Sequence, residues 1–364
     1  MAATSSLFGL ELLGLEERLG ELGEPRYRAR QLYAWLYAKR ARSFAQMTDL
    51  GLDLRQRLEA EHRLEWPEVQ KRQRSADQTV KYLFRLRDGV TIETVLIPEP
   101  GRRTLCISTQ AGCPLRCTFC LTGIAGFRRN LHPGEILGQV AAVMEESESE
   151  EPEPRRPFNV VVMGMGEPLL NPDGVFPALR ILMDPKGFAI PPRRLTVSTV
   201  GILPGLERLA EEPVRPNLAI SLHAPDPGLR RALMPVEARY PIEKVLKTLE
   251  GYRVPRGGRV TFEYVLLRGV NDSPAHARSL VRLLRKAHGK LNLIPLNPAP
   301  EIPFEAPSAE AVDAFCHILT RADLTVSVRR PRGQDILAAC GQLRLSGSRP
   351  FPSRRAPSAS RVAG

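Results

Sequence analysis

The sequence has no long apolar run. No stretch of its 364 residues approaches the roughly 20 consecutive apolar residues that a membrane span needs. The N-terminus also lacks the basic start and apolar core that define a secretory signal. Because both features are absent, we expect a cytoplasmic protein with no membrane partner.

Acidic residues are too few to balance the basic ones. The chain has 40 Asp and Glu against 52 Lys and Arg, and its formal net charge is +12. An excess of this size suits a polyanionic partner, most simply nucleic acid, because it raises the association rate and the non-specific affinity. A basic proteome or a need for solubility would give the same excess, so charge alone leaves the partner open.

Cysteine is scarce and unevenly distributed. There are six in the chain, and a cytosolic protein of this length does not need structural disulfides. Three of the six fall within eight positions, which indicates metal binding and not a disulfide framework. These are Cys113, Cys117 and Cys120; the remaining three are Cys106, Cys316 and Cys340.

The first 98 residues are predicted to form a helical accessory domain that ends in a β-hairpin. Helical spacing of apolar residues predicts helices over 10–22, 27–42 and 54–62. From about Val69 the apolar period changes to two, and Asp88-Gly89 is a strong hairpin signal. Residues 71–87 carry six basic side chains and one acid. A solvated strand face and a face that contacts RNA phosphates explain this equally well.

From Thr104 the pattern alternates between strand and helix, which predicts an α/β fold with a parallel sheet covered by helices. We expect a partial or open (β/α) barrel as the core, over 99–334, then a short segment over 335–343 and a disordered basic tail over 344–364. Strands are expected over 105–108, 159–163, 195–198, 217–221, 261–266, 291–295 and 325–328. The main helices between them are expected over 133–146, 175–183, 206–211, 242–252, 275–288 and 309–321.

The spacing Cys113-x3-Cys117-x2-Cys120 follows the first core strand. Three thiolates can hold three irons of a 4Fe–4S cluster and leave the fourth iron open. Structural zinc also favours cysteine, but it takes four ligands, usually as two separated pairs. The nearest additional ligands are His132 and Cys106, and neither has a convincing spacing. The pattern therefore favours an iron–sulfur cluster of the type that cleaves S-adenosylmethionine (SAM).

Polar residues follow several core strands at the point where each strand ends. The loop after the second strand contains Gly166 and Glu167. Ser198 ends the third strand, Ser221-Leu222-His223 ends the fourth, and Asn297 follows the sixth. One such residue would be explained as a helix cap or a turn. Because the carboxyl ends of parallel strands share one rim, the series predicts a binding pocket there.

Four segments give the chain a family resemblance. They are Thr91-Ile-Glu-Thr-Val-Leu-Ile-Pro98, Leu105-Cys-Ile-Ser-Thr-Gln-Ala-Gly-Cys113, Gly126-Phe-Arg-Arg-Asn-Leu131 and Gly333-Gln-Asp-Ile-Leu-Ala-Ala-Cys-Gly-Gln-Leu343. The chain resembles the RlmN radical-SAM RNA methyltransferases, whose close relative is the resistance enzyme Cfr. The resemblance extends from the N-terminal helices to about Leu343, and the segment around Cys340 is its most specific part.

The resemblance implies a partial (β/α) radical-SAM barrel with a 4Fe–4S cluster held by Cys113, Cys117 and Cys120. It implies that SAM is bound by Gly166, Glu167, Ser198, Ser221, Leu222, His223 and Asn297. It also implies that Cys340 carries a methyl group, that Cys106 later forms a disulfide with it, and that Glu93 accepts a proton. Without the resemblance, Glu93 would be an exposed strand carboxylate, and the two thiols would be small buried hydrophobes.

The implied reaction is methylation of carbon 2 of an adenosine in 23S rRNA, and of the tRNA adenosine 3′ of the anticodon. An external electron donor such as flavodoxin and a monomeric enzyme are also expected. The loop over 121–125 varies among relatives and leaves the substrate open, so methylation at carbon 8, as in Cfr, is an alternative. Two further alternatives are a radical-SAM enzyme for a non-RNA substrate and an RNA-binding protein with structural metal.

Overall fold

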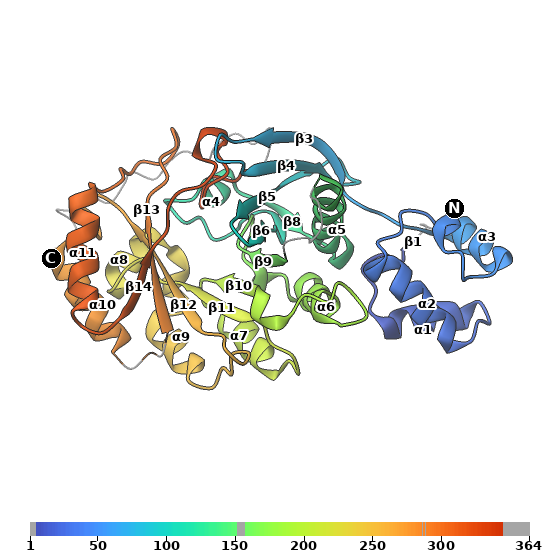
Figure 1. Ribbon diagram of the computed structural model, residues 1–364. Coiled ribbons are helices and arrows are strands. Elements are labelled where there is room, and N and C mark those ends of the chain that lie inside the picture. Colours follow the sequence, from blue (N-terminus) through green and yellow to red (C-terminus); the bar gives the residue numbers. More distant parts are fainter. Residues whose placement is uncertain (1–4, 151–156, 286, 288, 345–364) are drawn as a thin grey trace.

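The computed structural model describes residues 5–150, 157–285, 287 and 289–344. Its centre is a sheet of ten strands in the order β14-β13-β12-β11-β10-β9-β6-β5-β4-β3 (Figure 1). Seven strands pair in parallel: β6 (Arg102–Cys106), β9 (Phe158–Val162), β10 (Leu195–Thr199), β11 (Asn217–Ser221), β12 (Val260–Leu266), β13 (Gly289–Pro295) and β14 (Thr325–Val328). In the described part of the chain β14 and β3 are the two edges, so the barrel is open. The predicted α/β fold with a partial barrel is confirmed.

Helices of the core follow the parallel strands, because each must return the chain to the start of the next strand. The long α5 (Pro133–Glu150) precedes β9 and packs against α6 (Pro172–Met183). The remaining core helices are α4 (Leu121–Ala125), α7 (Leu203–Glu211), α8 (Pro227–Leu233), α9 (Ile242–Leu249), α10 (Pro274–Leu284) and α11 (Ala309–Thr320). None of the described helices is long and apolar enough to cross a membrane.

Three antiparallel strands extend the sheet beyond β6. They are β3 (Glu68–Arg74), β4 (Val80–Arg85) and β5 (Thr91–Glu99), and the predicted hairpin is β4–β5. These strands thus belong to the same sheet as the core. Carboxylates pair with most of the basic side chains over 71–87: Arg72 with Glu146, Arg74 with Glu150, Lys81 with Glu93, Arg85 with Glu68 and Arg87 with Glu65. This pairing supports the structural interpretation of the basic strip.

The N-terminal helices α1 (Leu12–Glu21), α2 (Arg26–Tyr33) and α3 (Leu52–Glu61) form a separate blue lobe in Figure 1. A π-helical turn, η1 (Ala34–Ala38), continues α2. Polar contacts tie this lobe to the core, including Tyr33 with Asp184 and Arg40 with Glu148. The predicted basic tail lies outside the described residues except for Arg344, and the division into domains stays a prediction.

A close backbone approach joins the lobe to α5. A Cβ placed on Gly138 of α5 would lie 2.2 Å from Cδ of Pro67, which is part of a rigid ring. Similarly, a Cβ on Gly134 would lie 2.4 Å from the Phe8 carbonyl oxygen. Glycine at both positions therefore lets the N-terminal segment lie directly on the helix.

We expect Gly138→Ala to lower the free energy of unfolding by about 1–3 kcal/mol, because the added methyl group must displace Pro67. Gly20→Ala is the matched control, since no heavy atom lies within 4 Å of a Cβ there. At that helical position alanine should be neutral or stabilising by up to about 1 kcal/mol. Urea denaturation of both variants checks the prediction, and equal midpoints would contradict the close approach.

Candidate active site

The loop with the three clustered cysteines is closed at its base by a short antiparallel pair, β7 (Gln110–Gly112) and β8 (Phe127–Asn130). The Cys113 amide donates to the Gly126 carbonyl at 2.8 Å across this base. Within the loop, a Cβ on Gly123 would lie 2.9 Å from the Cys117 nitrogen, so the chain passes itself too closely for a side chain. The Thr118 amide bonds the Leu233 carbonyl at 3.0 Å and fixes the loop to the end of α8.

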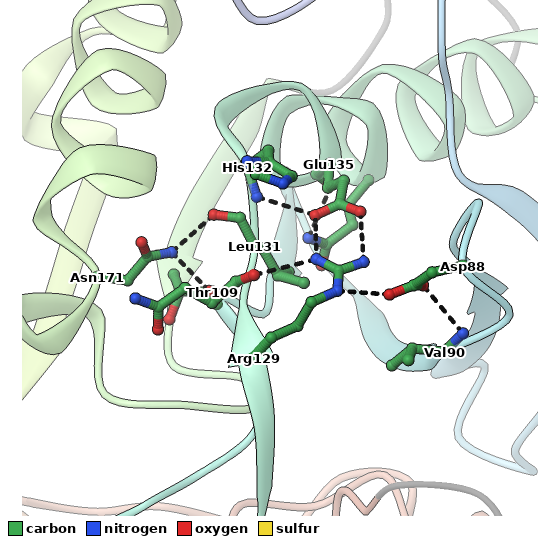
Figure 2. Close-up of polar contacts among 10 residues, drawn as sticks. Asp88, Val90, Thr109, Arg129, Leu131, His132, Glu135 and Asn171 are labelled. Carbon is green, nitrogen blue, oxygen red and sulfur yellow. Dashed lines mark hydrogen bonds and ion pairs between the residues drawn. The ribbon is translucent and has the colours of Figure 1, made fainter. Parts of the chain in front are cut away.

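Arg129 braces the base of this loop, as Figure 2 shows. Its guanidinium binds both carboxylate oxygens of Glu135 at 2.8 Å and one oxygen of Asp88 at 2.6 Å. It thereby joins β8 to α5 and to the β4–β5 turn. Asn171 adds a second brace by donating to the carbonyls of Thr109 and Leu131 (Figure 2).

A cavity of about 180 Å³ lies at the carboxyl ends of the parallel strands. Most of the residues predicted from the sequence line it: Cys113, Cys117, Cys120, Gly166, Glu167, Ser198, Ser221, His223, Asn297 and Cys340. Leu222 is fully buried, and its backbone amide donates to the Glu263 carbonyl at 2.9 Å. Glu93 and Cys106 are not among the lining residues. Residues from the ends of separate strands thus line one cavity.

The three thiols fit a metal cluster better than a single ion. Burial raises the pKa of Cys113 to about 12 and that of Cys117 well above its usual value. Thiolates are therefore stable here only with a compensating positive charge, which iron ions supply. Within the described residues, no three His, Cys, Asp or Glu side chains converge on a single metal ion. The amide of His132, one candidate zinc ligand, caps α5 through Glu135.

Glu167 presents a buried carboxylate to the cavity. Its oxygens accept hydrogen bonds from the Thr199 hydroxyl at 2.6 Å and from the amides of Val200 and Leu169. Burial raises its pKa to about 7, although these donors oppose the shift. Since Oε2 accepts only one of these bonds, it has a lone pair left for an ammonium group, which would restore the charged form.

His223 lines the cavity as a neutral imidazole. Its Nδ1 accepts the Val265 amide at 3.0 Å, and the edge of its ring meets Phe119. Burial lowers its pKa to about 3, and the nearby Arg230 acts in the same direction. The imidazole therefore stays neutral near neutral pH, which suits a binding surface and not a proton donor or acceptor.

The segment that bears Cys340 is held by hydrogen bonds over the cavity mouth. Asn297 Nδ2 donates to the Cys340 carbonyl at 3.2 Å, and the Leu121 amide donates to the Gly341 carbonyl at 2.7 Å. The Cys340 side chain is exposed. Cys106 is the last residue of β6, and burial raises the pKa of its thiol to about 12.

Glu93 is buried, in contrast to the exposed strand carboxylate that alternation alone suggests. One oxygen pairs with Lys81 Nζ at 3.0 Å, and the other accepts the Arg344 amide at 2.8 Å. Because Lys81 also donates to the Leu337 carbonyl, the C-terminal segment covers this side of β5. The covering residues are remote in sequence, so strand periodicity could not predict the burial.

Arg230 on α8 is a buried residue of this site that sequence reasoning missed. It donates to the carbonyls of Val200, Ser221 and Leu222 and forms an ion pair with Glu237. These carbonyls belong to the ends of two neighbouring strands, so a single guanidinium sets their spacing below the cavity.

Comparison with known proteins identifies the family. The Radical SAM superfamily model matches residues 107–281, and the Ribosomal RNA large subunit methyltransferase N-terminal domain model matches residues 5–64. The dual-specificity RNA methyltransferase RlmN of Nitratidesulfovibrio vulgaris (strain DP4) is 48% identical over 331 residues, covering 90% of this chain and 91% of the relative. The chain belongs to the RlmN family. An RlmN of Anaeromyxobacter dehalogenans (strain 2CP-C) is 45% identical over 98% of this chain and 96% of its own length.

Solved structures agree with this assignment. A radical SAM methyltransferase from Sphaerobacter thermophilus has a TM-score of 0.87 and 44% sequence identity, and the match covers 93% of this chain and 99% of that chain. As a radical-SAM enzyme of the RlmN family, the chain uses a 4Fe–4S cluster and SAM. The assignment of individual cysteines and SAM-binding residues stays a prediction that the cavity supports.

We expect Arg230→Met to lower the free energy of unfolding by about 3–5 kcal/mol, because it leaves Glu237 buried without its charge partner. The matched control is Arg268→Met, which removes an exposed ion pair with Glu305 and should cost less than about 1 kcal/mol. Urea denaturation of the two variants measures the difference. Similar losses would contradict a structural role for the buried pair.

Proposed function

We propose that this chain methylates carbon 2 of an adenosine in 23S rRNA at the peptidyl-transferase centre, and of the tRNA adenosine 3′ of the anticodon. The observation that carries the proposal is the exposed Cys340 thiol on the wall of the cavity that the three clustered cysteines line. The names of the curated relatives, dual-specificity RNA methyltransferases, support two RNA substrates. The net charge of +12 suits such polyanions.

A methyl group carried on the protein suits this reaction. Carbon 2 of adenine is electron-poor, so direct transfer of an electrophilic methyl group from SAM is poorly matched to it. When bound, the cluster supplies the electron that cleaves SAM and so the radical chemistry that this carbon requires. We assign Cys113, Cys117 and Cys120 to the cluster. An external electron donor such as flavodoxin and a monomeric state remain predictions.

Residues of this chain would bind SAM, carry the methyl group, remove the proton and release the RNA. Glu167 would hold the SAM ammonium group, while the other SAM residues shape the pocket for the rest of the molecule. Cys340 would take the methyl group and deliver its carbon to the base, and Glu93 would then remove the proton from the ring. Both Glu93 oxygens are engaged by Lys81 and Arg344, so it can act only after the segment that carries Cys340 shifts. Cys106 would attack Cys340 and release the RNA.

The test is mass spectrometry of nucleosides from 23S rRNA and tRNA of a host that lacks its own enzyme of this family. Expression of the wild type should produce 2-methyladenosine in both RNAs, and Cys340→Ala should abolish it. Cys316→Ala is the matched control, because Cys316 lies on α11 and does not line the cavity. Formation of 8-methyladenosine would contradict the carbon-2 assignment, and unmodified RNA would contradict the function.

We also expect Cys106→Ala to trap RNA on the protein, because no thiol remains to resolve the Cys340-linked adduct. Denaturing gels should show a covalent protein–RNA species for this variant and none for the Cys106→Ala/Cys340→Ala double variant. Recovery of only free, uncrosslinked RNA from Cys106→Ala would overturn the resolving role.

A further inference from the structure

Arg329 is a cavity residue for which no sequence pattern predicts a role. It directly follows β14, and its amide donates to the Leu293 carbonyl at 2.8 Å, which continues the pairing with β13. Its side chain lines the cavity, and Nη1 donates to Sγ of Cys340 at 3.5 Å. The guanidinium thus meets the sulfur atom that would carry the methyl group.

Besides Cys340, two acidic groups and one cation lie within electrostatic reach of this guanidinium. The acidic groups are the thiol of Cys106 and the carboxylate of Glu263 on β12. Glu263 is buried; its Oε1 accepts a hydrogen bond from Asn292 at 2.9 Å, and its Oε2 has no hydrogen-bond partner among the described residues. Arg102 is the nearby cation. The other titratable groups on the cavity wall are Cys113, Cys117, Cys120, Glu167 and His223.

We propose that Arg329 selects Cys340, and not Cys106, as the methyl acceptor, because its guanidinium donates directly to the Cys340 sulfur. This inference rests on the proposed function. A thiolate is the nucleophilic form of cysteine, and a charged donor stabilises it more than it stabilises the neutral thiol. Of the two thiols, as far as the structure describes the chain, Cys340 receives a hydrogen bond from Arg329 and Cys106 does not. Burial keeps Cys106 in its thiol form, with a pKa of about 12, so it stays available for the later step.

The methyl transfer balances without any additional reactant. An electron pair on the Cys340 sulfur forms a bond to the SAM methyl carbon, and the bond from that carbon to the sulfonium sulfur breaks. The electrons of the broken bond stay on the departing sulfur, which gives S-adenosylhomocysteine. The negative charge of the thiolate and the positive charge of the sulfonium cancel. Arg329 then faces a neutral thioether, and Glu263 becomes its main anionic neighbour.

Alkylation of the cluster-containing protein tests this inference without turnover. Iodoacetamide is added anaerobically over a range of pH, and the tryptic peptide 333–344 reports Cys340 alone. Arg329→Gln should slow alkylation of that peptide at pH 7 by about tenfold, because the charged donor that favours the nucleophilic form of the sulfur is lost. Arg329→Lys keeps the charge and should retain most of the rate. Arg330→Gln, the exposed neighbour with the same charge change, should match the wild type.

The same digests distinguish a failure of the proposed function from a failure of the role proposed for Arg329. Incubation with SAM should add a methyl group to peptide 333–344 of the wild type and none to peptide 104–116, which contains Cys106. If the wild type is not methylated at all, the proposed function fails, while the alkylation profiles still report on Arg329. If folded Arg329→Gln, verified by circular dichroism, has the wild-type alkylation profile, the role of Arg329 is refuted even when methylation is normal.

Discussion

The geometry of the cavity depends on one buried guanidinium. Arg230 donates hydrogen bonds to carbonyls at the ends of β10 and β11. Its charge is balanced by Glu237, whose oxygens also accept a hydrogen bond from the Ile242 amide. Carbonyls at strand ends have no partner in the sheet, so burying them without a donor would cost free energy. A planar group with five donors can satisfy three of them at once. This contact therefore positions the end of β11 at Ser221 and the loop that carries His223.

Several acidic groups line the cavity, and burial disfavours their charged forms unless a positive charge lies close by. Burial raises the pKa of Glu167 to about 7 and also raises the pKa of Glu263 and of the Cys113 and Cys117 thiols. Binding of an ammonium group, a sulfonium group or iron ions would lower these pKa values again, so that the acidic groups release their protons. The site is therefore complementary to cations, and binding and ionisation are coupled.

Sequence patterns anticipated the features that depend on local order. The parallel strands, the rim to which Glu167, Ser198 and Asn297 belong, and the cysteine loop all follow from elements that are close in the chain. The structure adds what depends on remote contacts. Arginines such as Arg230 and Arg329 normally lie on the surface, so nothing in the sequence marked them as cavity residues. The polar strand β3 shows no alternation because both of its faces are largely exposed, and it exists through its pairing with β4.

The C-terminal segment is attached in a way that suits a carrier. Polar contacts hold the part of the segment that precedes the cysteine: Asp335 accepts from Ser75, Gly333 donates to Asp77, and Gln334 donates to Asn297. Close to the cysteine, the small apolar residues Ala338 and Ala339 are buried. Hydrogen bonds of this kind can exchange for bonds to water or RNA at little net cost, whereas buried apolar contacts would be lost outright on moving. The same segment occupies Glu93 through the Arg344 amide. Displacing the segment would therefore move Cys340 and free one oxygen of Glu93 in one event, which would couple the two steps proposed for these residues.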